Sequence, residues 1–312
     1  MRARLHPAFV IVAFLLLGNA GCTLIETQAQ PQTPPAAALE YVGAWGVKGD
    51  GPGQLDQPVS LSTDSHGNIY VADAGSRFVH KFAPQGKPLL SFQEDPLKSP
   101  EWITLDHGGA IYVADPSRNS VFIFLPSGDR YRELRLRTRP TRENLLSVAV
   151  GWDGLIHVLD SNAAKVYTFT PRLRLIHSWQ TPADSAGSRN RPGPIQTGPD
   201  GSLYVANPSG SRIMRFTREG QLLSEIGANL DGTGARLSHE FAVSSNFIFV
   251  MDTDGRMLHV WTLDGRPKLD VDLAPELGQA ARQAPALAIS PRNELLVLDT
   301  PETRVLRYHI NF

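Results

Sequence analysis

A short run of apolar residues recurs six times along the chain, and each run ends in Asp or Asn. The ends of successive runs are 42 to 47 residues apart, with an aromatic residue nine positions after each end and a Gly or Asn six positions before it. A pattern held at fixed offsets through six copies predicts a repeat architecture. The runs are Ile69–Asp73, Ile111–Asp115, Ile156–Asp160, Leu203–Asn207, Ile248–Asp252 and Leu295–Asp299.

Each unit divides into four short strands separated by turn residues. In the first unit we expect an inner strand at Ser60–Thr63, then the apolar run, a third strand at Val79–Phe82 and an outer strand at Leu89–Phe92. Turns such as Asp64–Asn68 contain Gly, which adopts the positive φ that tight hairpins require. The second strand is almost entirely apolar, which is typical of a strand packed on both faces. The pattern therefore predicts four-stranded antiparallel sheets.

The two ends of the chain predict how the repeat closes. The sixth unit has strand patterns at Ala286–Ile289, Glu294–Leu298 and Val305–Ile310, and it is one strand short. A strand-like stretch at residues 40–45 precedes the first unit and lacks a partner there. Placing it on the last blade completes six blades of four strands and removes an open edge. The sequence thus predicts an all-β fold, a six-bladed β-propeller of four-stranded antiparallel blades, over residues 40–312.

The first unit carries a motif that closely resembles the NHL repeat. Its Gly-rich segment Gly46–Pro58 ends in Gly-Gln-Leu-Asp-Gln-Pro, and in that family a connection ending in G-Q-[FL]-x-x-P leads into the inner strand. A weaker second copy stands at Gly232–Leu237. The resemblance covers residues 40–312 and implies the same six-bladed fold.

The first 21 residues have the layout of an export signal. Arg2 and Arg4 precede an apolar run at Ala8–Leu17, which is too short for a transmembrane helix of about 20 residues. The small residues before Cys22 resemble a bacterial lipoprotein signal, in which the cysteine is acylated and becomes the new N-terminus. Asn19 departs from that pattern, since a large aliphatic residue is usual there. Cleavage by an ordinary signal peptidase stays open as the alternative.

These features predict three parts: a signal peptide at 1–21, a disordered tether at 22–39 and the propeller at 40–312. The tether is rich in Gln, Pro and Ala and has no apolar periodicity, as in an extended linker. The lipoprotein resemblance implies an exported protein anchored to the cell membrane. Thr23 follows the cysteine where an Asp commonly retains such proteins at the inner membrane, which favours the outer membrane, facing the periplasm or the cell surface.

Composition narrows the functional classes. Cys22 is the only cysteine, so no disulfide forms within the chain and the exported fold must depend on its core. The formal net charge of −1 gives no basic excess for nucleic acid. We therefore expect no nucleic-acid partner and no cofactor, and we expect a monomeric domain.

The Asp or Asn that ends each second strand is the most regular polar position. A ring of carboxylates for cations is one interpretation, but sixfold repetition favours a structural role because catalytic sites are asymmetric. Asp side chains accept backbone N–H groups of a following turn, and a basic residue follows three to five positions later in each unit. We expect the acidic side chains to hold turns and to pair with these basic residues, which are Arg77, Arg118, Lys165, Arg212, Arg256 and Arg304.

The residues that enter the inner strands are candidates for the mouth of the central channel. In the second and fifth units these positions carry polar or bulky residues, whereas other units have small or aliphatic ones. No two histidines have a metal-ligand spacing such as H-x-x-x-H, so we assign no metal and no catalytic residue. The candidates for ligand binding, against the alternative of a solvated rim, are Glu101, Trp102, His239 and Glu240.

Basic residues crowd the predicted outer strand of the second unit and the segment after it. Such a strip is suited to an anionic polymer or an acidic partner, whereas charged outer strands also discourage aggregation through sheet edges. The strip comprises Arg130, Arg132, Arg135, Arg137, Arg139 and Arg142.

The connections after second and fourth strands share one face of a propeller and vary most between units. They include Ala74–Ser76, Pro116–Asn119 and the long segment Thr181–Pro194, and recognition is usually built on such loops. We therefore expect a membrane-tethered binding or scaffold module for a protein, peptide or glycan of the cell envelope. The alternative is a metal-dependent enzyme, because related propellers include lyases, lactonases and sugar-acid hydrolases with a site at the channel mouth.

Overall fold

A computed structural model describes most of the repeat region. Residues 37–312 form one compact unit. Cys22 and the predicted signal peptide lie outside the described residues, as do Arg137, Arg139 and Arg142. Among the residues that are described, no helix is long and apolar enough to cross a bilayer. The described residues are 38–94, 97–136, 146–182, 192–207, 211–227, 237–277 and 286–312.

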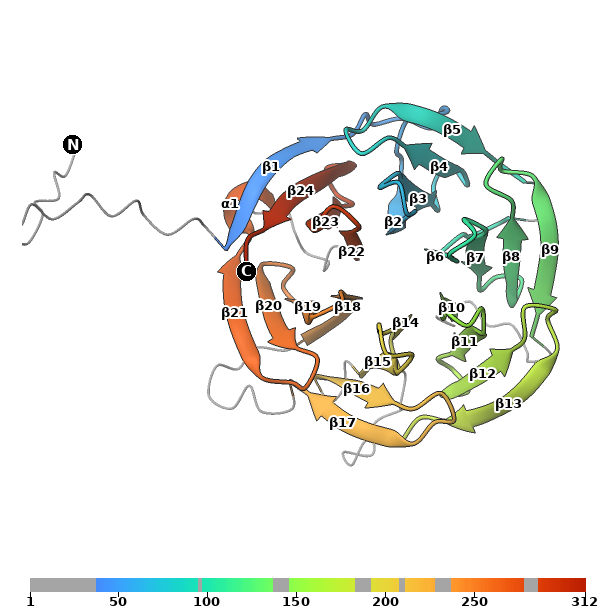
Figure 1. The fold of residues 1–312 in the computed structure, drawn as a ribbon. Coiled ribbons are helices and arrows are strands. Elements are labelled where there is room, and N and C mark those ends of the chain that lie inside the picture. Colours follow the sequence, from blue (N-terminus) through green and yellow to red (C-terminus); the bar gives the residue numbers. More distant parts are fainter. Residues whose placement is uncertain are drawn as a thin grey trace, which may run out of the picture. The chain divides into compact units, whose positions relative to one another are not determined.

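Six four-stranded antiparallel sheets stand around a common axis as the blades of a propeller (Figure 1). The inner strands are β2 (Pro58–Thr63), β6 (Trp102–Leu105), β10 (Leu146–Val150), β14 (Ile195–Thr197), β18 (Leu237–Val243) and β22 (Ala286–Ser290). The second strands are β3 (Ile69–Asp73), β7 (Ile111–Asp115), β11 (Ile156–Asp160), β15 (Leu203–Asn207), β19 (Phe247–Asp252) and β23 (Glu294–Asp299). The predicted fold class is confirmed.

The two remaining strands of each blade lie further from the axis. The third strands are β4 (Val79–Phe82), β8 (Ser120–Phe124), β12 (Lys165–Phe169), β16 (Arg212–Phe216), β20 (Met257–Thr262) and β24 (Arg304–Ile310). The outer strands are β5 (Pro88–Phe92), β9 (Arg130–Arg135), β13 (Leu175–Gln180), β17 (Leu222–Ile226), β21 (Pro267–Asp272) and, in blade six, β1 (Leu39–Trp45). The strand positions follow the sequence pattern, with small shifts at the ends.

Hydrophobic residues fill the space between neighbouring blades. All residues of β3 and β7 are buried because each sheet is covered on both faces. One cluster lies between each pair of adjacent blades; for example, Val71 and Phe82 of blade one pack with Leu296 and Val305 of blade six. The core is therefore a ring of six interfaces.

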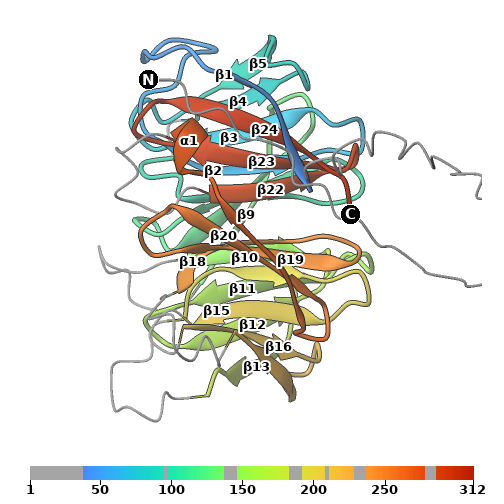
Figure 2. The ribbon, with the colours of Figure 1, turned by 90° about the vertical axis from the view of Figure 1, so that its left-hand side faces the viewer.

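The ring is closed by the two ends of the repeat region. Strand β1 pairs antiparallel with β24, from Leu39 opposite Ile310 to Trp45 opposite Val305, and Figure 2 shows the blue strand beside the red one. The predicted closure by residues 40–45 is therefore consistent with the structure, in which the strand begins one residue earlier. Backbone pairing thus removes an edge that would otherwise be open.

A bulky residue near the end of an outer strand packs on a turn of the next blade. Trp45 lies over Gly86, and Trp179 lies over Gly220 in the same way. A Cβ at either glycine would come within 2.3 Å of the indole, and both glycines have positive φ. In blade three the residue at the position of these glycines is Leu173, which adopts φ 63° and packs against the hydrophobic cluster between blades two and three.

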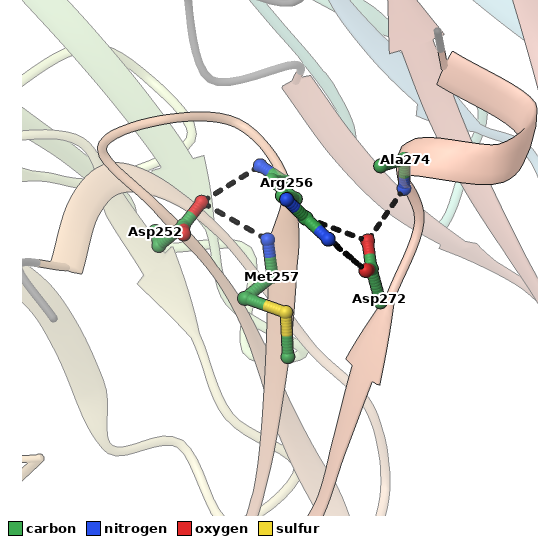
Figure 3. A network of polar contacts seen from close by, with 5 residues as sticks. All are labelled: Asp252, Arg256, Met257, Asp272 and Ala274. Atoms are coloured by element: carbon green, nitrogen blue, oxygen red, sulfur yellow. Dashed lines mark hydrogen bonds and ion pairs between the residues drawn. The ribbon is translucent and has the colours of Figure 1, made fainter. Parts of the chain in front are cut away.

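Blade five ends in a polar network that fixes its connection to blade six (Figure 3). Asp252 Oδ1 accepts the backbone N–H groups of Arg256 at 2.8 Å and Met257 at 3.1 Å. The guanidinium of Arg256 donates to both carboxylate oxygens of Asp272. Asp272 also accepts the N–H of Ala274 at 2.9 Å, at the start of the short helix α1 (Ala274–Leu277). These bonds set the direction in which the chain leaves the blade.

Candidate functional site

The antiparallel blades sort their connections onto two ends of the propeller. The turns that join first to second strands, such as residues 64–68, lie at one end together with the turns that join third to fourth strands. We call this the turn end. The loops after second strands, such as residues 74–76, lie at the opposite end with the blade-to-blade connections. We call that the connection end.

A cavity of about 550 Å³ lies on the axis at the turn end. All six inner strands line it, so it is a product of the whole ring. Its volume falls in the range of small-ligand sites, about 300–1,000 Å³. The second residue of every first-to-second-strand turn contributes to its lining: Ser65, His107, Trp152, Pro199, Ser245 and Pro291.

Polar side chains in the cavity wall connect neighbouring inner strands. Gln196 Nε2 donates to the carbonyl of Phe241, and its Oε1 accepts the N–H of Val243 at 3.1 Å. Thr197 Oγ1 donates to the carbonyl of Val150 at 3.2 Å. An inner strand has no further strand on its axial side, so these side chains satisfy backbone groups that would lack partners. The wall is thereby a fixed scaffold.

Two carboxylates that line the cavity are held by their own blades. Asp64 accepts the N–H of Asn68 at 2.9 Å and forms an ion pair with Lys81 at 3.4 Å. Burial acts to raise the pKa of Asp64, but the hydrogen bonds from Asn68 and the charge of Lys81 outweigh it and lower the pKa below its usual value. Asp106 accepts the hydroxyl of Tyr112 at 3.1 Å. Burial, followed by the charge of Asp106, raises the pKa of Tyr112, so that hydroxyl stays protonated and donates.

Trp152 stands out among the lining residues. It is 70% exposed, the highest exposure among the large hydrophobic side chains of the described residues, and its ring contacts that of His107 in the neighbouring blade. The adjacent Asp153 accepts the N–H of Leu155 at 3.0 Å and the guanidinium of Arg218 at 2.6 Å. Burial acts to raise the pKa of Asp153, but these two bonds lower it, so the carboxylate is ionised at neutral pH.

Trp102, a residue predicted for the channel mouth, lies in the cavity wall. It begins β6 with 7% exposure, and its Nε1 donates to the carbonyl of Val148 in blade three at 3.0 Å. Its polar atom therefore joins two blades. Glu101 precedes it, does not line the cavity and accepts the hydroxyl of Ser99 at 3.2 Å. Burial raises the pKa of Glu101.

The other two predicted mouth residues lie in β18 of blade five. Glu240 is 9% exposed and is not part of the cavity lining. His239 belongs to the same strand, and its side chain lies outside the description. The four predicted residues therefore belong to blades two and five. Among those whose side chains are described, Trp102 is the one that lines the cavity.

The described part of the arginine strip lies on β9. Arg130 pairs with Glu133 at 2.9 Å and lies over the ring of Phe122. Arg132 lies over the ring of Tyr131, and Arg135 is exposed at the end of the strand. Two of these three guanidinium groups therefore already have partners within the blade.

At the connection end, the carboxylates that end second strands bind backbone N–H groups, as predicted. Asp73 accepts those of Asp56 at 2.7 Å and Gln57 at 3.1 Å, which belong to the connection entering its blade. It also accepts two N–H groups of the following turn, including that of Ser76 at 3.0 Å. Asp115 binds the incoming connection at the same offsets, through the N–H of Lys98. One side chain thus fastens two chain segments together.

The predicted pairing of these acids with the following basic residue holds in blade six. There Arg304 Nε donates to Asp299 at 2.9 Å. The prediction is wrong for Arg212 and Arg256, which form ion pairs with Glu225 and Asp272 of their outer strands. The reason is geometric: the outer-strand carboxylates lie opposite the start of the third strand, from which the arginines extend.

The same end contains residues in a left-handed backbone conformation that the sequence did not reveal. They stand four positions after the terminal Asp or Asn in five blades, whereas in blade five the residue with positive φ is Gly255, three positions after Asp252. Residues other than glycine are strained at positive φ, so the carboxylate bonds act against that strain. The residues are Arg77, Asn119, Ala164, Ser211 and Thr303.

Among the described residues, no group of three or more His, Cys, Asp or Glu side chains is arranged to hold a metal ion.

The sequence matches no family model and no curated protein, whereas the fold resembles solved structures. A streptogramin B lyase has a TM-score of 0.63 at 12% identity, covering 88% of this chain and 97% of that chain. A catalytically inactive virginiamycin B lyase from Staphylococcus aureus, solved with quinupristin, has a TM-score of 0.60 at 15% identity, covering 81% and 80%. The β-propeller domain of Myceliophteria thermophila Cps50 (Swd1) has a TM-score of 0.61 at 10% identity, covering 88% and 100%.

These similarities concern the fold, since all the identities are low. Together with the closed ring of six four-stranded sheets, they place the chain among the six-bladed β-propellers. Such a scaffold carries different functions on the same architecture, so the function must be argued from the site.

Proposed function

We propose that this protein is a binding module of the cell envelope, an NHL-type propeller that is exported and held at a membrane by an acylated Cys22. It acts as a scaffold for a protein, peptide or glycan partner, and the outer membrane is the favoured location. The motif at Gly46–Pro58 and the small residues before Cys22 support this proposal.

The observation that carries the binding function is Trp152 at the mouth of the axial cavity. An indole that is 70% exposed leaves a large apolar surface in water. Covering a large hydrophobic side chain contributes about 1.5–3 kcal/mol, and Trp is enriched among the residues that dominate binding energies. The surrounding polar groups are already bonded between blades, so the partner meets a preformed surface.

The binding surface that we propose differs from the one expected from loop variability. The variable loops lie at the connection end, where Asp73 and Asp115 use nearby backbone groups to hold the fold. The cavity opens at the turn end. A role of Glu101 and His239 in ligand binding stays a prediction, and Glu101 lies where the chain enters β6 from the connection end.

A comparative pull-down from solubilised envelopes tests the proposal. The bait is the full-length protein, and the variants are Trp152→Ala and the control Tyr131→Ala, which removes an aromatic of 55% exposure from β9. We expect the same envelope component on wild-type and Tyr131→Ala baits, and its loss on Trp152→Ala. Equal capture by all three baits would show that the cavity mouth is not the binding surface.

An enzymatic function is the competing proposal, because two of the similar structures are named as lyases. The test is incubation of the purified protein with virginiamycin B, together with metal analysis. Turnover of that substrate, or a stoichiometric zinc or calcium ion that is lost on Glu101→Gln, would replace the binding function by catalysis.

The anchor has its own test. Cys22→Ser should move the protein from the membrane to the soluble fraction, since no acyl chain can be attached. Unchanged membrane retention would refute lipid tethering through Cys22.

A further inference from the structure

The turn between first and second strands has an equivalent position in every blade, and Trp152 occupies it in blade three. Its turn has the same backbone bond as that of blade one: Gly154 N–H donates to the carbonyl of Gly151 at 2.9 Å, as Gly67 does to Asp64. The other blades form the turn with Ser, His or Pro at this position. Neither turn geometry nor core packing therefore requires a tryptophan here.

The surroundings of Trp152 keep its ring at the cavity mouth. The ring of His107 contacts it from blade two. On the blade-four side the ion pair of Asp153 and Arg218 is part-exposed, with side-chain exposures of 36% and 49%. Asp153 follows Trp152 in the same turn, so this ionised carboxylate and the guanidinium bound to it lie next to the turn that carries the indole and remain accessible to a ligand.

The cavity below offers uncharged hydrogen-bonding groups. Ser62, Thr104 and Asn293 line it together with backbone groups of the inner strands. Its two carboxylates are held by their own blades: Asp64 is paired with Lys81, and Asp106 accepts from Tyr112. The site therefore presents hydroxyls, amides and two carboxylates beside one aromatic face, and among the described residues its lining contains no lysine or arginine that would attract an anion.

We infer that the cavity mouth binds a neutral carbohydrate, with Trp152 as the surface on which a sugar ring stacks. A pyranose ring has an apolar C–H face that suits an aromatic face, and its hydroxyls both donate and accept hydrogen bonds. The carboxylate of Asp153 and the guanidinium of Arg218 provide charge-assisted partners for those hydroxyls. This inference rests on the proposed function, because it names the ligand class of the same cavity.

The test is titration of the full-length Cys22→Ser protein with four neutral hexaoses: cellohexaose, maltohexaose, laminarihexaose and chitohexaose. Binding is measured by calorimetry and by tryptophan fluorescence. We expect at least one sugar to bind, to shift the emission and to be insensitive to added salt, because it carries no charge. Trp152→Ala should weaken its Kd by about tenfold or more, whereas Trp152→Phe, which keeps an aromatic face, should stay within about threefold.

Two controls keep the outcomes distinct. Tyr131→Ala should bind like the wild-type protein, and thermal unfolding checks that each variant is folded. If no hexaose binds while the envelope pull-down still depends on Trp152, the carbohydrate inference is overturned and the binding module stands, with a protein or peptide as its partner. If both experiments are negative, both proposals fail. Salt-sensitive binding of polygalacturonate in place of the neutral sugars would also overturn the inference.

Discussion

The two ends of this propeller are built from the same six units, yet they use their side chains differently. At the connection end, Asp73 and Asp115 repeat one structural role, which is to bind backbone N–H groups of an incoming connection. At the turn end the backbone turns repeat, while the residue at the second turn position varies from Ser65 to Trp152. The comparison indicates that repeated side chains hold the fold, whereas a side chain that departs from the repeat is not needed for it and is free to take the binding role that we propose for Trp152.

The energetics of the two ends differ accordingly. Removing a buried acceptor leaves N–H groups without partners, at a cost of about 1–3 kcal/mol for each group. Removing an exposed side chain changes folding little. Substitutions at the connection end should therefore lower stability and spare binding, and Trp152 substitutions should do the reverse.

The largest effect should come from deleting residues 39–45, which opens the ring and disturbs both ends. The deletion removes the strand paired with β24 and the packing of Trp45 on Gly86. We expect the Tm to fall by about 10 °C or more, measured by circular dichroism. A deletion of residues 24–36, before the compact unit, is the control and should leave the Tm unchanged. A wild-type Tm after loss of β1 would contradict closure by this strand.

Asp73→Ala should be the most damaging single substitution at the connection end. It removes the acceptor of four backbone N–H groups in two segments, and three of these bonds are only part-buried, so water can replace the lost acceptor there. We therefore expect a loss of about 2–4 kcal/mol in the free energy of unfolding. Urea denaturation measures it. The control Asp254→Ala removes an exposed carboxylate from the equivalent turn of blade five and should cost little. Both variants should still bind the partner at the cavity. Loss of binding in folded Asp73→Ala protein would contradict the view that the connection end serves stability and the turn end serves binding.

Acid should also weaken the connection end, through His80. Its Nδ1 accepts from Gly53 N–H at 3.3 Å and Ser91 Oγ at 2.9 Å, and burial lowers its pKa from 6.5 to about 4. The unfolded chain takes up the proton first, so stability is lost as the pH falls from about 6.5 to about 4, by about 3 kcal/mol at most. His80→Phe should flatten this dependence, measured by urea denaturation across the range. An equally steep profile in the variant would assign the acid sensitivity to other groups.

Relief of backbone strain at a left-handed residue should increase stability, in contrast to the preceding substitutions, and by a smaller amount. Ala164 has φ 49° in the loop after β11, and glycine adopts this conformation more easily. Ala164→Gly should raise the free energy of unfolding by about 0.5–1 kcal/mol. Ala163→Gly, at the neighbouring position without positive φ, should lower it. If both substitutions destabilise equally, the left-handed residue is not a source of strain.

Trp152→Ala should have the smallest effect on stability and the largest on binding. The side chain is mostly exposed, so the free energy of unfolding should change by no more than about 0.5 kcal/mol. Capture of the envelope partner should be lost in the same preparation. A marked drop in Tm would instead assign Trp152 to the fold.

The six blades could be predicted from the amino-acid sequence. Alternating apolar positions and turn residues such as Gly67 and Asn293 are local signals, and six copies at nearly constant spacing reinforce one another. Closure by residues 40–45 also followed from the sequence, because a blade short of one strand and a strand without a blade complement each other. The binding of backbone N–H groups by Asp73 was predicted for the same reason: it repeats.

Tertiary structure alone decided where the cavity lies and which side chains face it. Trp102 and Glu101 are neighbours in the chain, yet one lies in the cavity wall and the other does not. Trp152 stands in a turn formed with Gly and Asp residues. A large apolar residue in such a turn could have indicated a binding residue from the sequence. The place of Trp152 at the mouth depends on six inner strands meeting around one axis. The arrangement of the inner strands depends on packing between blades, so it cannot be predicted from the sequence of one unit.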